Sequence, residues 1–270
     1  MADSSTQTPS GDPLREGFQP ISVKSPADHP LLFKLRCVVD LQLATTVKYL
    51  QPALARLHGR VLDVGAGQSP WRAWLPPGTS YLGVDVGNSD EFGMTQGRKD
   101  VVYYDGKVLP FSDAGFDGIL CVEVLEHAQD PQLLLLEIAR VLKVGGTMLL
   151  TVPWSARRHH IPHDYHRFTR ERLLQMLEQN GFADIDIKER GSDVGVIANK
   201  LIVLTIRLLR LKSILRMLWQ LPLGLVCGTL ALGFVVAAHC SDALDMGAKE
   251  DPLGYFVQAT RAGPILAGSH

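Results

Sequence analysis

The sequence predicts an α/β protein with a mostly parallel sheet and helices on both faces. Short apolar segments typical of buried strands alternate with helical segments from residue 60 to residue 152. A glycine-bearing turn, Gly65-Ala66-Gly67, follows the first strand, and acidic residues follow several later ones. Because crossovers between parallel strands are right-handed, helices must cover both faces, and ligands bind at the carboxyl ends of the strands.

In the first half of the chain, apolar residues at helical spacing predict a helix from Leu31 to Leu57, interrupted near Pro52. A second helix should begin at Pro70, because proline suits the first helical position. The polar connection of residues 91–99 has little periodicity. Three short apolar runs predict strands over residues 60–64, 81–84 and 101–104.

In the second half, Asp130-Pro131 predicts a capped helix that runs to about Lys143, where Gly145-Gly146 should stop it. Thr169 should cap another helix, which ends near Gln179. Strands are expected over residues 118–122, 147–152 and 183–190.

Length and charge limit the classes of protein. The chain has 270 residues, a net charge of −1 and a pI near 6.7, so we expect one α/β domain with an appendage and no nucleic-acid partner. The first 20 residues lack a basic start and an apolar stretch, so we expect a disordered tail over residues 1–30 and not a signal peptide. Four cysteines without a Cys-x-x-Cys motif indicate reduced core thiols: Cys37, Cys121, Cys227 and Cys240.

The first turn has the features of a nucleotide-binding turn with one departure. Asp85 follows Gly65 by 20 positions, at the end of the second strand, where a carboxylate can accept both ribose hydroxyls. Pro70 stands in place of the third glycine of the dinucleotide pattern, and Asp63 would repel a pyrophosphate. These residues favour a cationic adenosine ligand without phosphates.

Five motifs occur in a recognisable order, over residues 61–67, 81–85, 109–117, 124–127 and 140–146. With them the chain resembles the class I S-adenosylmethionine-dependent methyltransferases that share the type 11 methyltransferase domain. The resemblance runs from about Leu54 to Phe182, with a weaker match at residues 252–258. It implies a methyltransferase enzyme, S-adenosyl-L-methionine as cofactor, and a Rossmann-like seven-stranded sheet whose last strand, near residues 255–259, is antiparallel.

The resemblance also implies which residues bind the cofactor. Asp85 would hold the ribose, and Asp105 lies where the family has an acidic residue near the adenine amino group; a turn-forming role for Asp105 is the alternative. The full expected set is Asp63, Gly65, Gly67, Asp85, Asp105 and Glu123.

Methyl transfer to a hydroxyl requires alignment and a base near the methyl group. We expect the catalytic residues His127, after the fourth strand, and His163 with Asp164, in a loop after the fifth. That loop resembles a Pro-His-Asp-x-x-Arg-Phe-Thr signature found beside bacterial glycan functions. The loop could bind the acceptor, take part in catalysis or form only structural hydrogen bonds. We expect no metal site, although the spacing of four histidines could provide metal ligands: His159, His160, His163 and His166.

Three arginines near the same loop, Arg157, Arg158 and Arg167, could hold an acidic acceptor such as a phosphate or uronate; simple solvation is the alternative.

Residues 194–245 form an apolar helical insert within the methyltransferase domain, which we assign to residues 31–193 and 250–262. Apart from the terminal histidine, residues 217–239 carry no acidic or basic side chain. This segment is about as long as a membrane-spanning helix. A single crossing would separate the last strand from its sheet. We therefore expect a hairpin that contacts anionic headgroups through residues 194–240, and the alternative is a cap or dimer interface.

These observations predict a methyltransferase that O-methylates a small-molecule, glycan or lipid-linked acceptor near the membrane. We expect the protein in the cytoplasm, and the membrane hypothesis would place it at the inner face of the membrane. Alternatives are methylation of a quinone or an acyl carboxyl, and a non-catalytic binding protein that retains the fold. A nicotinamide-dependent oxidoreductase is disfavoured by Pro70 and by the lack of an evident hydride-transfer residue set.

Overall fold

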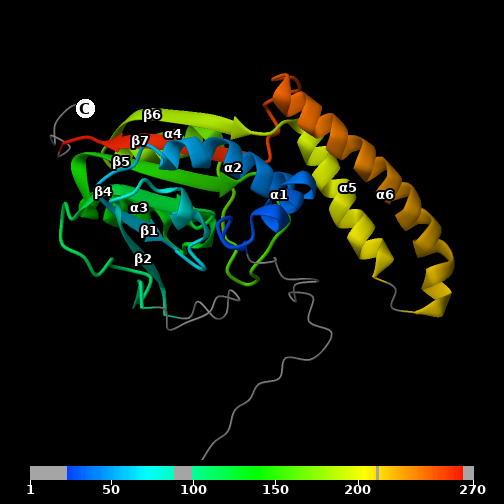
Figure 1. The fold of residues 1–270 in the computed structure, drawn as a ribbon, viewed down its shortest axis with the longest axis horizontal. Coiled ribbons are helices and arrows are strands. Elements are labelled where there is room, and N and C mark those ends of the chain that lie inside the picture. Colours follow the sequence, from blue (N-terminus) through cyan, green and yellow to red (C-terminus); the bar gives the residue numbers. More distant parts are fainter. Residues whose placement is uncertain (1–22, 88–98, 211–212, 264–270) are drawn as a thin grey trace, which may run out of the picture.

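The computed structural model describes residues 23–87, 99–210 and 213–263. They contain a seven-stranded sheet in the order β3-β2-β1-β4-β5-β7-β6 (Figure 1). The strands are β1 (Arg60–Val64), β2 (Ser80–Val86), β3 (Val101–Tyr104), β4 (Phe116–Val122), β5 (Leu142–Pro153), β6 (Phe182–Arg190) and β7 (Gly254–Arg261). The first five are parallel, and β7 is antiparallel to both of its neighbours. The predicted fold class is confirmed.

Helices pack on both faces of the sheet because its side chains alternate between two cores. Val61, Leu120 and Leu149 belong to the core that includes residues of α2, and Leu62, Ile119 and Met148 to the core that includes α3 and α4. The helices are α1 (Pro30–Val39), α2 (Leu41–Leu54), α3 (Pro131–Val141), α4 (Arg170–Gln179), α5 (Asp193–Leu209) and α6 (Ile214–Ala243).

Three expectations about helices need correction. The predicted first helix is divided at Asp40, whose side chain accepts the backbone N–H of Leu43 and caps α2, while Pro52 is accommodated inside α2. The segment at Pro70 forms only a short 3-10 helix, η1 (Pro70–Trp74). Gly145-Gly146 does not end α3, because the chain is already extended at Leu142, which pairs with Phe116 of β4.

The predicted caps at Asp130 and Thr169 are present, and each accepts a backbone N–H of the following helix. Other expectations lie outside the described residues. They concern residues 1–22 of the expected tail and most of the polar connection at residues 91–99.

Helices α5 and α6 pair as a hairpin that projects away from the carboxyl ends of the parallel strands (Figure 1). Small residues line its seam. A Cβ added at Gly224 would lie 2.9 Å from Leu209 Cδ2, so glycine permits the close approach. By length and composition, α6 is the one helix of the described chain that could cross a membrane, and 28% of its most apolar window is buried.

Candidate functional site

The first turn after β1 requires glycine for steric reasons. Gly65 and Gly67 have φ angles of +69° and +48°, in the left-handed region. A Cβ at Gly65 would lie 2.4 Å from Cγ2 of Val124, which follows β4. The turn therefore packs directly against the end of the neighbouring strand, and a side chain at position 65 would overlap it. Together with Asp85, these two glycines form what we call the donor rim.

Asp85 holds this turn from the end of β2. Its Oδ2 accepts the N–H of Gly67 at 2.9 Å, and its Oδ1 accepts the N–H of Val86 at 2.8 Å. Burial raises the pKa of Asp85, and the two backbone hydrogen bonds oppose that effect. The carboxylate thus lies beside the glycine turn, where the sequence predicts a ribose ligand.

Two other predicted cofactor residues have local partners. Asp63 is buried and accepts the Tyr81 hydroxyl at 2.7 Å, so its carboxylate faces β2. Asp105, after β3, is exposed and accepts the N–H of Lys107 at 3.0 Å, which lowers its pKa. The structure therefore shows the turn-forming arrangement for Asp105, and adenine binding by this residue stays a prediction.

Glu123 turns the chain sharply at the end of β4. Its φ of +54° is unusual for a residue with a side chain, and such backbone strain costs of order 1–3 kcal/mol. Its Oε1 forms an ion pair with Nη2 of Arg190 at 2.7 Å, and the Arg190 side chain has no exposed surface. Arg190 also donates to Thr46 and to the carbonyl of Val152.

Sequence reasoning missed this buried arginine, because nothing at the end of β6 distinguishes it from a solvated residue. It ties three elements together at the carboxyl edge of the sheet.

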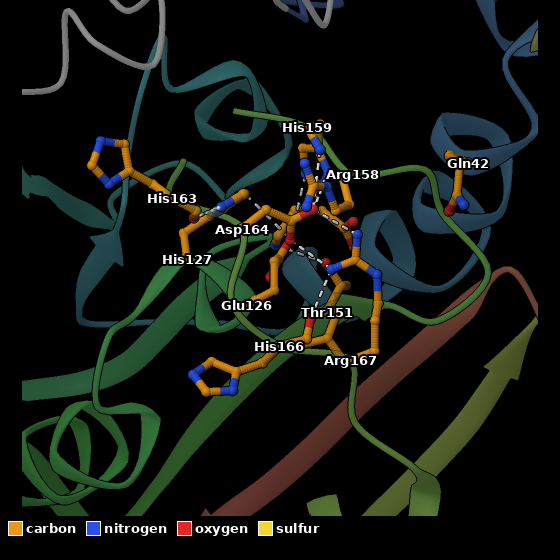
Figure 2. Close-up of polar contacts among 12 residues, drawn as sticks. Gln42, Glu126, His127, Thr151, Arg158, His159, His163, Asp164, His166 and Arg167 are labelled. Atoms are coloured by element: carbon orange, nitrogen blue, oxygen red, sulfur yellow. Dashed lines mark hydrogen bonds and ion pairs between the residues drawn. The ribbon is translucent and has the colours of Figure 1, made fainter. Parts of the chain in front are cut away.

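The structure brings together a second set of side chains beside the donor rim, which we call the His–Glu cluster: Glu126, His127 and His159. Glu126 and His127 lie on a single 3-10 turn, η3 (Leu125–His127), directly after β4, and His159 comes from the loop after β5. Oε1 of Glu126 lies 3.7 Å from Nε2 of His127 and 4.0 Å from Nε2 of His159 (Figure 2).

The loop after β5 is held by Asp164 and Arg167. Arg167 donates to both oxygens of Asp164, at 2.6 and 2.8 Å, and Asp164 Oδ2 accepts the backbone N–H of His159 at 3.0 Å. Burial alone would raise the pKa of Asp164, but its bonds from His159 and Arg167 lower it well below the ordinary value. A carboxylate held in this way positions the loop and is a poor proton acceptor.

His163 is placed differently from its sequence neighbour Asp164. Its ring points away from Glu126 (Figure 2), and its Nδ1 lies 3.1 Å from the hydroxyl of Tyr165. Its carbonyl oxygen accepts His127 Nδ1 at 2.7 Å. His163 and Asp164 thus contact the His–Glu cluster by a carbonyl and a carboxylate, and their catalytic roles stay predictions.

Burial shifts the pKa values of the cluster in opposite directions. Burial, reinforced by Glu123, raises the pKa of Glu126 well above its usual range, and burial lowers that of His127 to about 4. Paired titratable groups with divergent pKa values are typical of functional sites. Only the approach of two distant segments places Glu126 in this cluster.

The α/β fold places the donor rim at the carboxyl edge of its sheet, which is where doubly wound α/β proteins bind nucleoside ligands. Residues 62–150 match the methyltransferase domain family. A fatty-acid O-methyltransferase of Mycolicibacterium smegmatis is 37% identical over 130 residues, which cover 44% of this chain and 45% of that protein. A ubiquinone biosynthesis O-methyltransferase of Paracidovorax citrulli is 33% identical over 103 residues, or 34% of this chain and 43% of that protein.

A solved S-adenosylmethionine-dependent methyltransferase from Thermotoga maritima has the same fold, with a TM-score of 0.50 and 14% identity over 86% of this chain and 97% of that one. The chain therefore carries a class I methyltransferase domain, with S-adenosyl-L-methionine as cofactor. The predicted family and cofactor are confirmed. The chain spans less than half the length of the two curated relatives named above.

Proposed function

We propose that this chain is an S-adenosylmethionine-dependent methyltransferase that O-methylates a glycan or lipid-linked acceptor at a membrane surface. The main support is the position of the α5–α6 hairpin. β6 ends at Arg190 and α5 begins at Asp193, so the hairpin leaves the sheet at the edge that carries the donor rim. Arg190 itself contacts Glu123 of that edge.

In the proposed reaction, the C–S bond of the sulfonium donor breaks, and the sulfur keeps both electrons and becomes a neutral thioether. The acceptor oxygen supplies the electron pair of the new O–C bond and loses its proton. The donor rim would hold the nucleoside by Asp85 and by the backbone after Gly65. The His–Glu cluster could take the proton, because its carboxylate and imidazole groups follow β4 and β5 and lie at the same edge of the sheet as the donor rim.

The surface of the hairpin supports a membrane contact. Most of its large apolar side chains are exposed, among them Leu218 at 72%, Leu232 at 67% and Val236 at 64%. Helix α1 extends this surface: its Leu31 is 71% exposed, and the carbonyl of Val38 is 2.9 Å from Nε2 of His239 on α6. A helix that is apolar on all sides belongs in an apolar environment.

The basic residues of the hairpin favour one orientation in the membrane. Arg207 and Arg216 are exposed, and they belong to the last turn of α5 and the first turn of α6. The ends of the two helices that meet there lie far from the sheet (Figure 1). Insertion of that end into the bilayer centre would cost about 2.5–3.5 kcal/mol for each charge. We therefore propose that the hairpin lies along the headgroup region, its arginines near anionic lipid phosphates, at the inner face of the cytoplasmic membrane.

A second acceptor class is favoured by the relatives. The two named above act on fatty acids and in ubiquinone biosynthesis. An acyl carboxylate or a quinol would also suit the exposed apolar surface, with the hairpin as a cover for the substrate.

The first experiment is calorimetric titration with S-adenosylhomocysteine. Binding of about one equivalent to the chain, weakened in Asp85→Ala, is the expected result, and absence of binding would favour a protein that keeps the fold without turnover.

Labelled methyl transfer would then be compared between lipid-linked saccharides in anionic vesicles, free saccharides, fatty acids and a quinol. Transfer to the lipid-linked acceptors supports the proposal, and transfer to the quinol or fatty acid alone supports the second class.

Vesicle flotation tests the membrane contact. Leu218→Glu should reduce flotation with anionic vesicles, and Val144→Glu should not, because Val144 is also 59% exposed but lies on β5. Failure of the unchanged protein to float, together with a stable dimer in light scattering, would assign the hairpin to a dimer interface.

A further inference from the structure

We propose that Glu126, His127 and His159 bind a divalent transition-metal ion at the carboxyl edge of the sheet. Their ligand atoms, one carboxylate oxygen and two imidazole nitrogens, all lie within 4.8 Å of one another. Two histidines and one carboxylate are a recurrent protein ligand set for catalytic zinc and for non-haem iron. This set differs from the four histidines of the loop that the sequence spacing suggested.

The spacing of the three ligand atoms suits a metal better than direct hydrogen bonds. The Glu126 Oε1 distances of 3.7 and 4.0 Å to the two histidine nitrogens exceed hydrogen-bond length. Tetrahedral bonds of about 2.0–2.1 Å place neighbouring ligand atoms roughly 3.3 Å apart. Small side-chain rotations would therefore close the site around an ion.

Glu126 supplies an independent observation. Its side chain has no exposed surface, and neither carboxylate oxygen has a hydrogen-bond partner among the described residues. A buried, unpartnered carboxylate is costly, and such groups are normally hydrogen-bonded, paired or bound to a metal. A cation between the three ligands would satisfy this oxygen pair.

In both histidines the Nδ1 atom contacts a neighbouring oxygen, which fixes the orientation of the ring, as is usual for histidines that bind a metal. His127 Nδ1 lies 2.7 Å from the carbonyl of His163, so this nitrogen carries the proton and Nε2 is the acceptor. His159 Nδ1 lies 3.3 Å from Asp164 Oδ2, which leaves its Nε2 directed toward Glu126.

The local charge favours a cation. Arg167 is a positive side chain that acts on Glu126, but it is engaged by both oxygens of Asp164. Glu123 is neutralised by Arg190. Glu126 is then left with no hydrogen-bond partner for its carboxyl oxygens among the described residues. Nitrogen ligands favour zinc, iron or cobalt over magnesium, which prefers oxygen.

Three protein ligands leave coordination positions open to an acceptor. If the chain catalyses the methyl transfer proposed above, on which this role depends, the ion would bind the acceptor hydroxyl, lower its pKa and hold it near the donor methyl. With the ion bound, the hydroxyl proton would pass to solvent instead of to the His–Glu cluster, and the oxygen would attack the methyl as described above. Metal binding itself does not depend on that reaction.

The test compares metal retention in the full chain and three variants. The purified protein, Glu126→Gln, His159→Gln and the control His166→Gln would be dialysed against zinc and analysed by mass spectrometry for metal content. The ring of His166 points away from the cluster (Figure 2), and its Nε2 lies 3.1 Å from the carbonyl of Ala128. Cobalt would replace zinc for visible spectroscopy, which reports nitrogen and oxygen ligation directly.

We expect one zinc per chain in the unchanged protein and in His166→Gln, with affinity reduced by more than tenfold in both ligand variants, since even loss of a second-shell partner costs about 10–100-fold. No zinc in the unchanged protein, or equal zinc in all four, would overturn the proposal. His159 lies in the loop after β5, so His159→Gln decides the matter if Glu126→Gln fails to fold. S-adenosylhomocysteine titration of the same samples tests the proposed function separately, because the donor rim contains none of these residues.

Discussion

The donor rim and the His–Glu cluster lie at the same edge of the sheet but are built in different ways. The donor rim spans residues 65–85 and depends on backbone: two left-handed glycines and the N–H groups held by Asp85. The three side chains of the His–Glu cluster come from η3 and from a loop more than thirty residues later. A site made of local backbone leaves a clear trace in the sequence, and a site made of distant side chains does not.

The largest expected effect concerns the anchor that holds this edge together. Arg190→Met should reduce the free energy of unfolding by about 3 kcal/mol, the lower end of the cost of breaking a buried pair, because Glu123 keeps access to water. Urea denaturation measures the change. The matched control is Arg170→Met, whose ion pair with Glu189 is 45% exposed on the arginine side and should contribute about 0–1 kcal/mol. Equal losses in the two variants would remove Arg190 as an anchor.

The donor rim can be broken through its backbone. Gly65→Ala should reduce the free energy of unfolding by about 2–4 kcal/mol, from the left-handed backbone and the overlap with Val124. S-adenosylhomocysteine affinity should fall as well. Gly78→Ala provides the comparison, since its φ is +87° but a Cβ there meets nothing within 4 Å. Its cost should be about 1 kcal/mol. An equal loss of unfolding free energy in the two variants would mean that overlap with Val124 does not contribute to the cost of Gly65→Ala.

A smaller effect should follow from the side chain of the rim. Asp85→Ala should weaken S-adenosylhomocysteine binding by about 1.5–3 kcal/mol, because charge-assisted hydrogen bonds to the ribose are lost. Calorimetry of Asp105→Ala serves as the reference. If Asp105 binds adenine as predicted, Asp105→Ala should also weaken S-adenosylhomocysteine binding. An unchanged affinity would mean that Asp105 only forms the turn through its hydrogen bond to Lys107.

The smallest effect is a pH dependence of donor binding. Burial raises the pKa of Asp85 in the free protein, whereas ribose hydroxyls donated to its carboxylate favour the ionised form in the complex. Affinity should therefore be complete above the raised pKa and should decrease as the pH falls through it. Titrations from neutral to acidic pH measure this limb. Asp85→Asn should flatten it, and an unchanged acid limb in that variant would exclude Asp85 as the titrating group.

The sequence by itself determined the fold class, the cofactor and the placement of the donor rim. Alternating strands with right-handed crossovers allow few topologies, and the glycine positions at 65 and 67 follow from a backbone conformation that other residues resist. Helix boundaries at Asp130 and Thr169 were equally local, because a capping side chain bonds to an N–H three residues away.

Only the tertiary structure decided the rest. The partner of Glu123 is Arg190, 67 residues away, and the neighbours of Glu126 depend on the path of the loop that Asp164 and Arg167 hold. The apolar character of residues 214–243 could be read directly, but their exposure could not, because burial depends on what the folded chain places against a helix. Contacts between distant segments arise from packing of the whole domain, and no local pattern encodes them.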